Sequence, residues 1–334
     1  MPYGPENFSA VTRHPYLLID INTATPRLES TQLKSVCEKL KQLPCPVIGI
    51  TGRNRSALPL TLLSSLDVIL TSEKEASSIV KNILNAPLAA MILVQLLRHN
   101  ETTNIHQGLF AESIAYATLQ GGVEFQNFIT QRRASKNISS KTADKQRTTM
   151  TEPPVITKRH NDELLLTLNR PERNNAYSIL MRDQLFEGLQ LLAEDLSIKR
   201  AIIRGAGNCF CVGGDLDEFG LFRDTATAHA IRSTRNVGKL ISELADRIEC
   251  HVHRACIGSG IELPAFCERI VATEKTMFQL PEITMGLIPG AGGTVSILRR
   301  IGRQRTAFLA LSAKKINSRK ALEWGLIDAI EPAP

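Results

Sequence analysis

The chain has 334 residues, of which 43% are hydrophobic and 22% are charged. This composition is typical of a globular protein with a packed core, and at about 150 residues per domain the length predicts two domains. The net charge is +7, aromatic residues make up only 5%, and no basic helix carries interleaved aromatic side chains. The sequence therefore gives no indication of nucleic-acid binding.

The sequence also predicts neither a membrane protein nor a secreted one. No apolar run approaches the roughly 20 residues of a membrane helix, and residues 1–20 lack the basic and apolar regions of a secretory signal. The seven cysteines do not follow the spacing of a disulfide framework. We therefore expect reduced thiols and a cytoplasmic protein that makes no membrane contact.

Three short stretches of the N-terminal part parallel three stretches further along the chain. The pairs are residues 17–22 with 164–169, 43–52 with 246–255, and 66–74 with 267–275. The members of the first pair are 147 residues apart in the sequence, and those of the other two pairs are about 201 residues apart. The first copy would therefore lack about fifty residues between its first two stretches. Two interpretations stay open: a degenerate internal repeat, or chance similarity between βαβ pieces.

Residues 134–154 form the next distinct segment. They are rich in Ser, Thr and Lys, show no hydrophobic periodicity and end in two prolines. This composition predicts a flexible linker, which divides the chain into an N-terminal part, residues 10–133, and a C-terminal part, residues 155–334.

Strands and helices alternate along the C-terminal part. The predicted strands are residues 162–170, 200–207, 249–258 and 269–274, and the predicted helices are residues 178–195, a stretch that ends near Ala245, and a helix that opens at Gly258. Such alternation predicts an α/β domain with crossover connections.

Two glycine-bearing loops in this part could stabilise negative charge. Gly213 and Gly214 allow the backbone to approach a ligand closely. Gly258, Ser259 and Gly260 open a helix, where unpaired N–H groups favour an anion. If both loops faced one pocket, they would form an oxyanion hole, although either alone is typical of a plain turn.

Two glutamates lie beside these loops. Glu262 falls in the first helical turn after Gly258, and Glu282 follows a proline twenty residues later. Two carboxylates that converge on a water molecule can divide the work of base and acid when their surroundings differ. Taken singly, each would be an ordinary surface acid.

Three rival motifs are weaker. His251 and His253 share one face of a strand, as metal ligands can, but no further ligand set is evident, so we expect no metal. A serine-hydrolase elbow would need glycine at Ile257 and Ile261. A dinucleotide fingerprint fails because position 295 is valine and no strand precedes it.

The motifs GGDL, GSGIELPAF, PEITMGLIPGAGGT and ALEWGLIDAI, between Val155 and Ile330, together resemble the enoyl-CoA hydratase/isomerase (crotonase) superfamily. The resemblance implies the ClpP/crotonase fold, an α/β spiral of ββα units that binds an acyl-CoA thioester. By the same resemblance, the N–H groups of Gly214 and Ser259 hold the thioester oxygen, while Glu262 and Glu282 are the catalytic pair. The positions expected to contact substrate or CoA are Arg173, Gly213, Asp215, Phe219, Phe222, Arg254 and Gly258.

The chain departs from the family pattern in two places. Arg254 stands where the family has a glycine, so it could crowd the site or contact a polar acyl group. The chain also ends at Pro334, before the helices that close the family's active site, whereas residues 85–133 resemble that helical tail. We therefore hypothesise that residues 10–133 are a degenerate crotonase-like unit whose tail serves the catalytic core at 155–334.

These observations predict hydration of an α,β-unsaturated acyl thioester, or the reverse dehydration, without a cofactor. The thioester could be on CoA or on an acyl carrier, and enoyl isomerisation is an alternative. A non-catalytic acyl-carrier-binding or scaffold subunit is an alternative of another class. We expect a homo-oligomer, dimer or trimer, that binds neither nucleic acid nor membrane.

Overall fold

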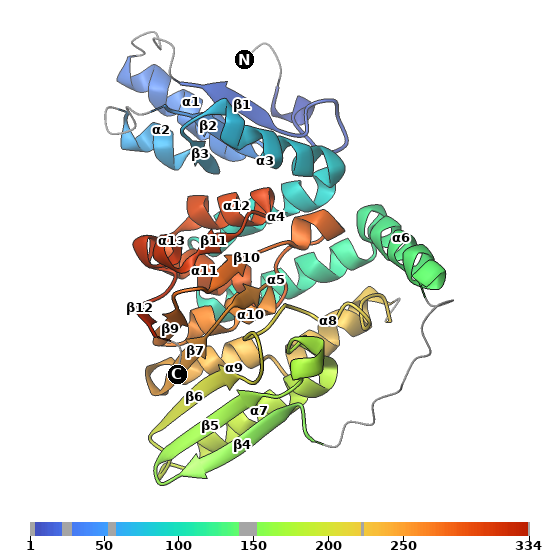
Figure 1. Ribbon diagram of the computed structural model, residues 1–334. Helices are drawn as coiled ribbons and strands as arrows, with labels where there is room; N and C mark the ends of the chain where they lie inside the picture. Colours follow the sequence, from blue (N-terminus) through green and yellow to red (C-terminus); the bar gives the residue numbers. More distant parts are fainter. Residues whose placement is uncertain (1–3, 22–28, 53–57, 140–151, 222–223, 333–334) are drawn as a thin grey trace.

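The computed structural model describes residues 4–21, 29–52, 58–139, 152–221 and 224–332. The sheet of the N-terminal part lies at the top of Figure 1, and the large sheet of the C-terminal part lies at the bottom. Helices of both parts are packed between these two sheets. Most buried apolar residues of the two parts belong to one continuous cluster, so the parts share a core.

The N-terminal part begins with a small three-stranded parallel sheet. Its strand order is β1-β2-β3, with β1 at Leu17–Asp20, β2 at Val47–Ile50 and β3 at Val68–Leu70. Three helices connect or follow these strands, namely α1 (Ser30–Gln42), α2 (Leu60–Ser64) and α3 (Glu73–Asn85). A short 3-10 turn, η1 (Pro5–Asn7), precedes them.

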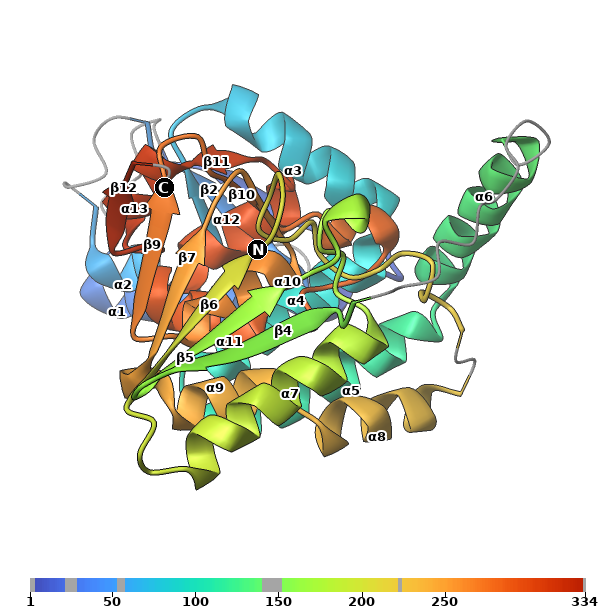
Figure 2. The ribbon, with the colours of Figure 1, turned by 60° about the horizontal axis from the view of Figure 1, so that its bottom comes forward.

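Three further helices carry the chain from this sheet into the C-terminal part: α4 (Pro87–Asn100), α5 (Ile105–Gln120) and α6 (Val123–Ser139). Helix α4 packs against α3 on one side and against α11 and α12 of the C-terminal part on the other. Figure 2 shows α5 beneath the large sheet, beside α8 and α9. Because α6 continues to Ser139, the predicted linker starts too early; most of the rest of that segment lies outside the described residues.

The C-terminal part contains a six-stranded sheet with the order β12-β9-β7-β6-β5-β4. All neighbours are parallel except the β4–β5 hairpin. The strands are β4 (Val155–His160), β5 (Glu163–Leu168), β6 (Arg200–Gly205), β7 (Ile248–Val252), β9 (Arg269–Thr273) and β12 (Ala329–Glu331). A smaller sheet has the order β11-β10-β8, from β8 (Ala255–Ile257), β10 (Met277–Gln279) and β11 (Ile316–Asn317).

The predicted strand 249–258 is in fact two strands in two sheets. The chain bends between β7 and β8 at Arg254, whose φ of +57° lies in the left-handed region. Glycine adopts this conformation at little cost, whereas other residues do not. This backbone geometry therefore accounts for a glycine preference at position 254.

The helices of the C-terminal part follow its strands. They are α7 (Ile179–Glu194), α8 (Thr225–Thr234), α9 (Val237–Glu243), α10 (Ser259–Glu262), α11 (Gly293–Ile301), α12 (Arg303–Ser312) and α13 (Ser318–Trp324). In α7, the Ser178 hydroxyl caps the N-terminus by accepting from the Met181 N–H. Buried Met181, Leu185, Leu189 and Leu192 recur at helical spacing and form its core face.

Strand order bears on the proposed internal repeat. The stretches that pair by sequence correspond to β1 with β5, β2 with β7 and β3 with β9. In the large sheet β5, β7 and β9 follow one another with only β6 inserted between the first two. The small sheet therefore has the same order without a counterpart of β6, which agrees with the fifty-residue gap; descent from a repeat stays a prediction.

The cysteines and the apolar helices bear on the expected reduced thiols and on membrane insertion. All seven cysteines are buried free thiols. Among the described residues no single helix is long and apolar enough to cross a membrane; α3 and α4 reach that length and apolarity only as a pair, which is bent by 111°.

Candidate functional site

Pairing between two chain segments brings the two glycine-bearing loops together. Cys211 forms a parallel bridge with Cys256, in which the Cys211 N–H donates to Ala255 O at 3.0 Å and the Ile257 N–H donates to Cys211 O at 3.0 Å. Parallel segments end at the same edge. The loop at 213–214 therefore lies against the loop at 258–260.

Close approach explains why glycine stands at these positions. Gly213 has φ +94°, and a Cβ there would lie 3.0 Å from Ile257 O; a Cβ on Gly260 would lie 2.5 Å from Cys211 O. Among the described residues, the N–H groups of Gly214 and Ser259 donate to no protein acceptor. The loops thus present two free backbone donors to the space between them.

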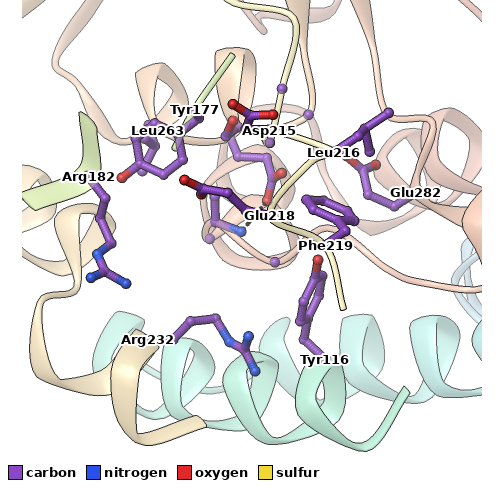
Figure 3. A pocket seen from close by; sticks show the side chains of 18 of the residues that line it. Tyr116, Tyr177, Arg182, Asp215, Leu216, Glu218, Phe219, Arg232, Leu263 and Glu282 are labelled. Carbon is purple, nitrogen blue, oxygen red and sulfur yellow. Dashed lines mark hydrogen bonds between the residues drawn. The ribbon is translucent and has the colours of Figure 1, made fainter. Parts of the chain in front are cut away.

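A cavity of about 530 Å³ opens at these loops. Its wall includes Gly213, Gly214, Asp215, Phe219, Gly258, Ser259, Glu262 and Glu282 from the C-terminal part, and Leu109, Glu112, Ser113, Tyr116, Gln120, Phe128 and Arg132 from helices α5 and α6. Figure 3 shows Tyr116 reaching the cavity from α5, across from Asp215. Both parts of the chain therefore build this cavity.

Glu262 ends the short helix α10 and is buried. Its Oε2 accepts hydrogen bonds from the N–H groups of Ala291, at 2.8 Å, and Gly293, at 2.9 Å. Burial disfavours the ionised form and raises its pKa to about 7, although the backbone donors oppose this shift. The carboxyl group can therefore gain or lose a proton near neutral pH.

Glu282 reaches the same place from the neighbouring strand. Strands β8 and β10 are parallel neighbours, so Glu262 and Glu282, which follow them, emerge at the same edge. A Cβ on Gly258 would lie 2.6 Å from Glu282 Oε1 and 3.7 Å from Glu262 Oε1. The two carboxyl groups thus converge on Gly258, where only a residue without a side chain fits.

The surroundings of Glu282 differ from those of Glu262. Glu282 Oε2 is buried and has no hydrogen-bond partner among the described residues. Burial raises the pKa of Glu282 well above its usual value, and the charges of Glu262 and Glu112 raise it further. Since no protein N–H compensates at Oε2, Glu282 favours its protonated form more strongly than Glu262 does.

A third buried carboxylate, Glu112 of α5, binds the same loop as Glu262. Its Oε1 accepts from the Gly292 N–H at 2.7 Å, and its Oε2 accepts from the Thr294 N–H at 2.9 Å and the Thr294 hydroxyl at 2.6 Å. Four successive N–H groups, from residue 291 to residue 294, thus donate alternately to Glu262 and Glu112. They lie at the N-terminus of α11, where negative charge is favoured.

The pKa of Glu112 is raised to about 8, chiefly by burial and then by the charge of Glu262. Two buried acids therefore bind one loop, and Glu282 lies close enough for its protonation to be coupled to theirs. Next to them, the Tyr116 ring packs on Gly290, where a Cβ would lie only 2.3 Å from Cδ2 of the ring.

Two of the predicted site residues, Arg173 and Arg254, lie outside the cavity wall, and a third cannot be placed. Arg254 is exposed and lies outside the cavity, because its positive φ places it in the bend between β7 and β8, so it does not crowd the site. Arg173 is also exposed and pairs with Asp217 at 2.8 Å. Phe222 lies outside the described residues.

The other predicted positions line the cavity. Asp215 is held there by a buried ion pair with Arg170, at 3.0 Å. The Phe219 ring covers Gly214, where a Cβ would lie 2.8 Å from the ring edge. Sequence reasoning did not identify Glu112, Tyr116 or Arg232, although the similarity of residues 85–133 to a helical tail pointed to the first two.

The rival metal site finds no support among the described residues, where no group of three or more possible ligands gathers. His251 Nε2 lies 2.7 Å from Glu249 Oε1, and His253 Nε2 lies 3.0 Å from Gly207 O. His251 thus contacts a residue of its own strand, β7, whereas His253 lies after the end of β7 and contacts the loop after β6.

Known proteins resemble the C-terminal part. Residues 159–334 match the family model described as enoyl-CoA hydratase/isomerase. The 2,3-dehydroadipyl-CoA hydratase of Escherichia coli strain K12 is 33% identical over 180 residues, which are 54% of this chain and 69% of that protein.

Solved structures give the same picture. An enoyl-CoA hydratase from Thermoplasma volcanium GSS1 is 27% identical with a TM-score of 0.52, covering 55% of this chain and 74% of that one. One from Mycobacterium smegmatis is 29% identical with a TM-score of 0.50, covering 54% and 71%. The similarity supports the α/β fold predicted for the C-terminal part.

Proposed function

Because the chain belongs to the enoyl-CoA hydratase/isomerase family, we propose that it adds water across the α,β double bond of an acyl-CoA thioester, or catalyses the reverse dehydration. One observation carries this proposal: Glu262 and Glu282 are buried with their Oε1 atoms directed at Gly258. Gly258 lies beside two backbone N–H groups that donate to no acceptor in the part of the chain that the structure describes.

The free N–H groups of Gly214 and Ser259 would hold the thioester oxygen. Negative charge develops on this oxygen when the double bond is attacked, and fixed donors stabilise it by about 3–4 kcal/mol each in a site that excludes water. The left-handed backbone at Gly213 and the close packing at Gly258 keep both donors in place. This arrangement suits any reaction that passes through a thioester enolate.

The two glutamates would then perform the acid–base steps. Ionised Glu262 takes a proton from water while the water oxygen forms a bond to the β-carbon. The electron pair of the double bond moves into the enolate. Protonated Glu282 gives its proton to the α-carbon, which restores the thioester carbonyl. The unsatisfied, strongly buried environment of Glu282 supports its role as the acid.

This division of roles predicts a bell-shaped dependence of kcat/KM on pH. The rate rises as Glu262 ionises, since its pKa is about 7, and falls at higher pH where Glu282 loses its proton. The apparent pKa values of the acid and alkaline limbs of this profile belong to the coupled pair of glutamates rather than to either residue alone.

Hydration is tested by the loss of enoyl-thioester absorbance, first with crotonyl-CoA and then with longer acyl groups. Glu262→Gln and Glu282→Gln should each lower kcat by about 10²- to 10⁴-fold, while circular dichroism verifies folding. If both variants hydrate the substrate at the full rate, the mechanism is wrong.

Enoyl isomerisation is the second candidate, because one carboxyl group can move a proton between two carbons above the same oxyanion hole. A 3-enoyl-CoA substrate distinguishes it: isomerisation creates the conjugated absorbance that hydration removes. A non-catalytic acyl-carrier-binding subunit would bind thioesters and change neither signal. The convergence of two buried acids on Gly258 favours catalysis, because burying neighbouring carboxyl groups without a partner of opposite charge is costly.

We also propose a role for the N-terminal part in this function. Its helices α5 and α6 contribute to the cavity wall, which supports the hypothesis that the tail at residues 85–133 serves the catalytic core. That residues 10–133 are a degenerate crotonase-like unit stays a prediction. A homo-oligomer and a cytoplasmic location remain our expectations.

A further inference from the structure

Four arginines line the cavity, and one of them differs from the rest. Arg182 pairs with Asp183 at 2.7 Å, Arg235 with Glu187 at 3.1 Å, and Arg132 with Asp217 at 3.2 Å. Arg232 of α8 forms no ion pair with any described residue, and its Nε is buried without a hydrogen-bond partner. Its positive charge is thus uncompensated in the cavity wall.

Neutral groups hold the Arg232 side chain in place. Nη1 donates to Gln120 Oε1 at 3.0 Å, Nη2 donates to Ser113 O at 3.3 Å, and the guanidinium carbon lies 4.6 Å from the centre of the Tyr116 ring. These partners all belong to α5. They fix the guanidinium group but leave its full charge uncompensated and its Nε–H without an acceptor among the described residues.

An uncompensated charge away from water is costly unless a ligand pairs with it. Burial of Arg232 accordingly lowers its pKa, and the nearby Glu112 only opposes this shift from a distance. Glu112 itself is occupied by Gly292 and Thr294. An anionic ligand group would supply the missing partner.

The position of Arg232 indicates which part of the substrate would reach it. The Tyr116 ring contacts Gly290 with one edge and carries the Arg232 guanidinium on its face. Gly290 is next to Ala291, which holds Glu262. The Tyr116 ring therefore lies between the Arg232 guanidinium group and the loop that binds Glu262. Figure 3 shows Arg232 on the side of the cavity away from Glu282.

We propose that Arg232 forms a subsite for a carboxylate at the far end of the acyl group, so that the preferred substrates are enoyl-CoA thioesters of dicarboxylic acids. This inference rests on the proposed function. A carboxylate is planar, carries a single charge and accepts from guanidinium N–H groups with good geometry. The free Nε–H and the fixed plane of Arg232 match such an acceptor.

The test compares two thioesters of equal length: trans-2-hexenoyl-CoA and its counterpart in which a carboxylate replaces the terminal methyl group. We expect the wild-type protein to have a kcat/KM about tenfold or more higher for the carboxylate, as for a hydrogen bond to a charged group. Arg232→Gln should remove this preference, and Arg232→Lys should retain part of it because the charge remains.

Arg299→Gln is the matched control. Arg299 also bridges the two parts of the chain through carbonyl oxygens, donating to Thr103 O at 2.7 Å and Val295 O at 3.0 Å, but it lies outside the cavity wall. It should leave the ratio of the two kcat/KM values unchanged. Loss of the preference in both variants would mean that general loosening of the interface is responsible.

The outcomes separate this inference from the proposed function. If neither thioester is hydrated, the proposed function fails, and the subsite is then tested by calorimetric binding of the saturated adipyl-CoA and hexanoyl-CoA. Tighter binding of adipyl-CoA that depends on Arg232 supports the subsite. Equal affinity, or an Arg232→Gln variant that weakens both thioesters alike, as a CoA phosphate contact would, overturns it.

Discussion

The N-terminal sheet of β1, β2 and β3 and the helices that follow it contact the C-terminal part in different ways. The sheet is anchored by the buried Asp67, which accepts from Arg303 at 2.8 Å and also from Arg98. Helix α5 instead places Glu112 on the backbone of the loop that holds Glu262. The first carboxylate fixes one part of the chain to another, whereas the second belongs to the cavity itself.

This difference teaches that burial alone does not identify a functional acid. Asp67 and Glu112 are almost equally inaccessible, but Asp67 is surrounded by guanidinium groups and Glu112 by backbone donors and other carboxyl groups. Burial and the neighbouring charge of Glu262 raise the pKa of Glu112 to about 8, as suits a group in a proton-transfer site. We therefore expect changes at Asp67 to affect stability and changes at Glu112 to affect catalysis.

The largest expected effect is on stability. Asp67→Ala leaves Arg303 buried without its central partner and removes the acceptor of the Val47 N–H. We expect the free energy of unfolding to fall by about 3–5 kcal/mol, measured by urea denaturation. The kcat of the protein that remains folded should change little; a loss below about 1 kcal/mol would contradict the role of Asp67 as an anchor.

Glu112→Gln should mainly affect turnover. An amide cannot accept from all three donors, so the loop at 291–294 shifts and Glu262 loses its alignment. Since small misplacements can reduce rates by about 100-fold, we expect kcat to fall by about 10- to 100-fold with little change in KM.

The pH profile separates this positioning role from a general loss of structure. Glu112 contributes to the raised pKa of Glu282, so Glu112→Gln should move the alkaline limb of the profile to lower pH. A variant that lowers kcat without moving this limb would indicate structural damage alone.

Stability should also depend on pH through the acids at the cavity. Glu112 and Glu262 have folded-state pKa values of about 8 and about 7, above the 4.5 of an unperturbed glutamate. The folded protein therefore binds more protons between these limits, and this stabilisation, complete below about pH 4.5, is lost as the pH rises through 7 to 8. Denaturation of Glu112→Gln across the same range should show a shallower decline; an equal slope would argue against protonation of Glu112.

Glu101→Gln should have the smallest effect. Glu101 is exposed and pairs with Arg303 at 2.9 Å, so the pair is partly screened by solvent and contributes about 1 kcal/mol or less. The Glu101→Gln variant replaces glutamate by glutamine at the same interface as Glu112→Gln does, so it serves as the control for that variant. A loss of kcat comparable to that of Glu112→Gln would indicate that any disturbance of the interface impairs the site.

The sequence predicted local features better than distant ones. Strands such as β5 and the helix α7 have clear apolar patterns within a short window. The break at Arg254 was not predicted, because a non-glycine residue with positive φ leaves no pattern. The convergence of Glu262 and Glu282 depends on the pairing of β8 with β10, so family motifs, rather than spacing, indicated it.

The contribution of the N-terminal part was predicted only in outline. Glu112 precedes Glu262 by 150 residues, and no local rule connects two acids across that distance. Similarity of residues 85–133 to a helical tail suggested that the segment closes the site, but the alternation of Glu112 and Glu262 along one loop required the structure. Arg232 was not predicted, because its lack of an ionic partner among the described residues could not be read from the sequence.

The central claim is that one thioester site is assembled from both parts of the chain. Its most direct test is to express residues 151–334 alone and to measure hydration of an enoyl-CoA that the full chain hydrates. The account predicts that this fragment, without Glu112 and Tyr116, retains about 1% or less of the full rate, and that adding a separate fragment of residues 1–139 restores part of it. A well-folded fragment with the full rate would contradict the claim.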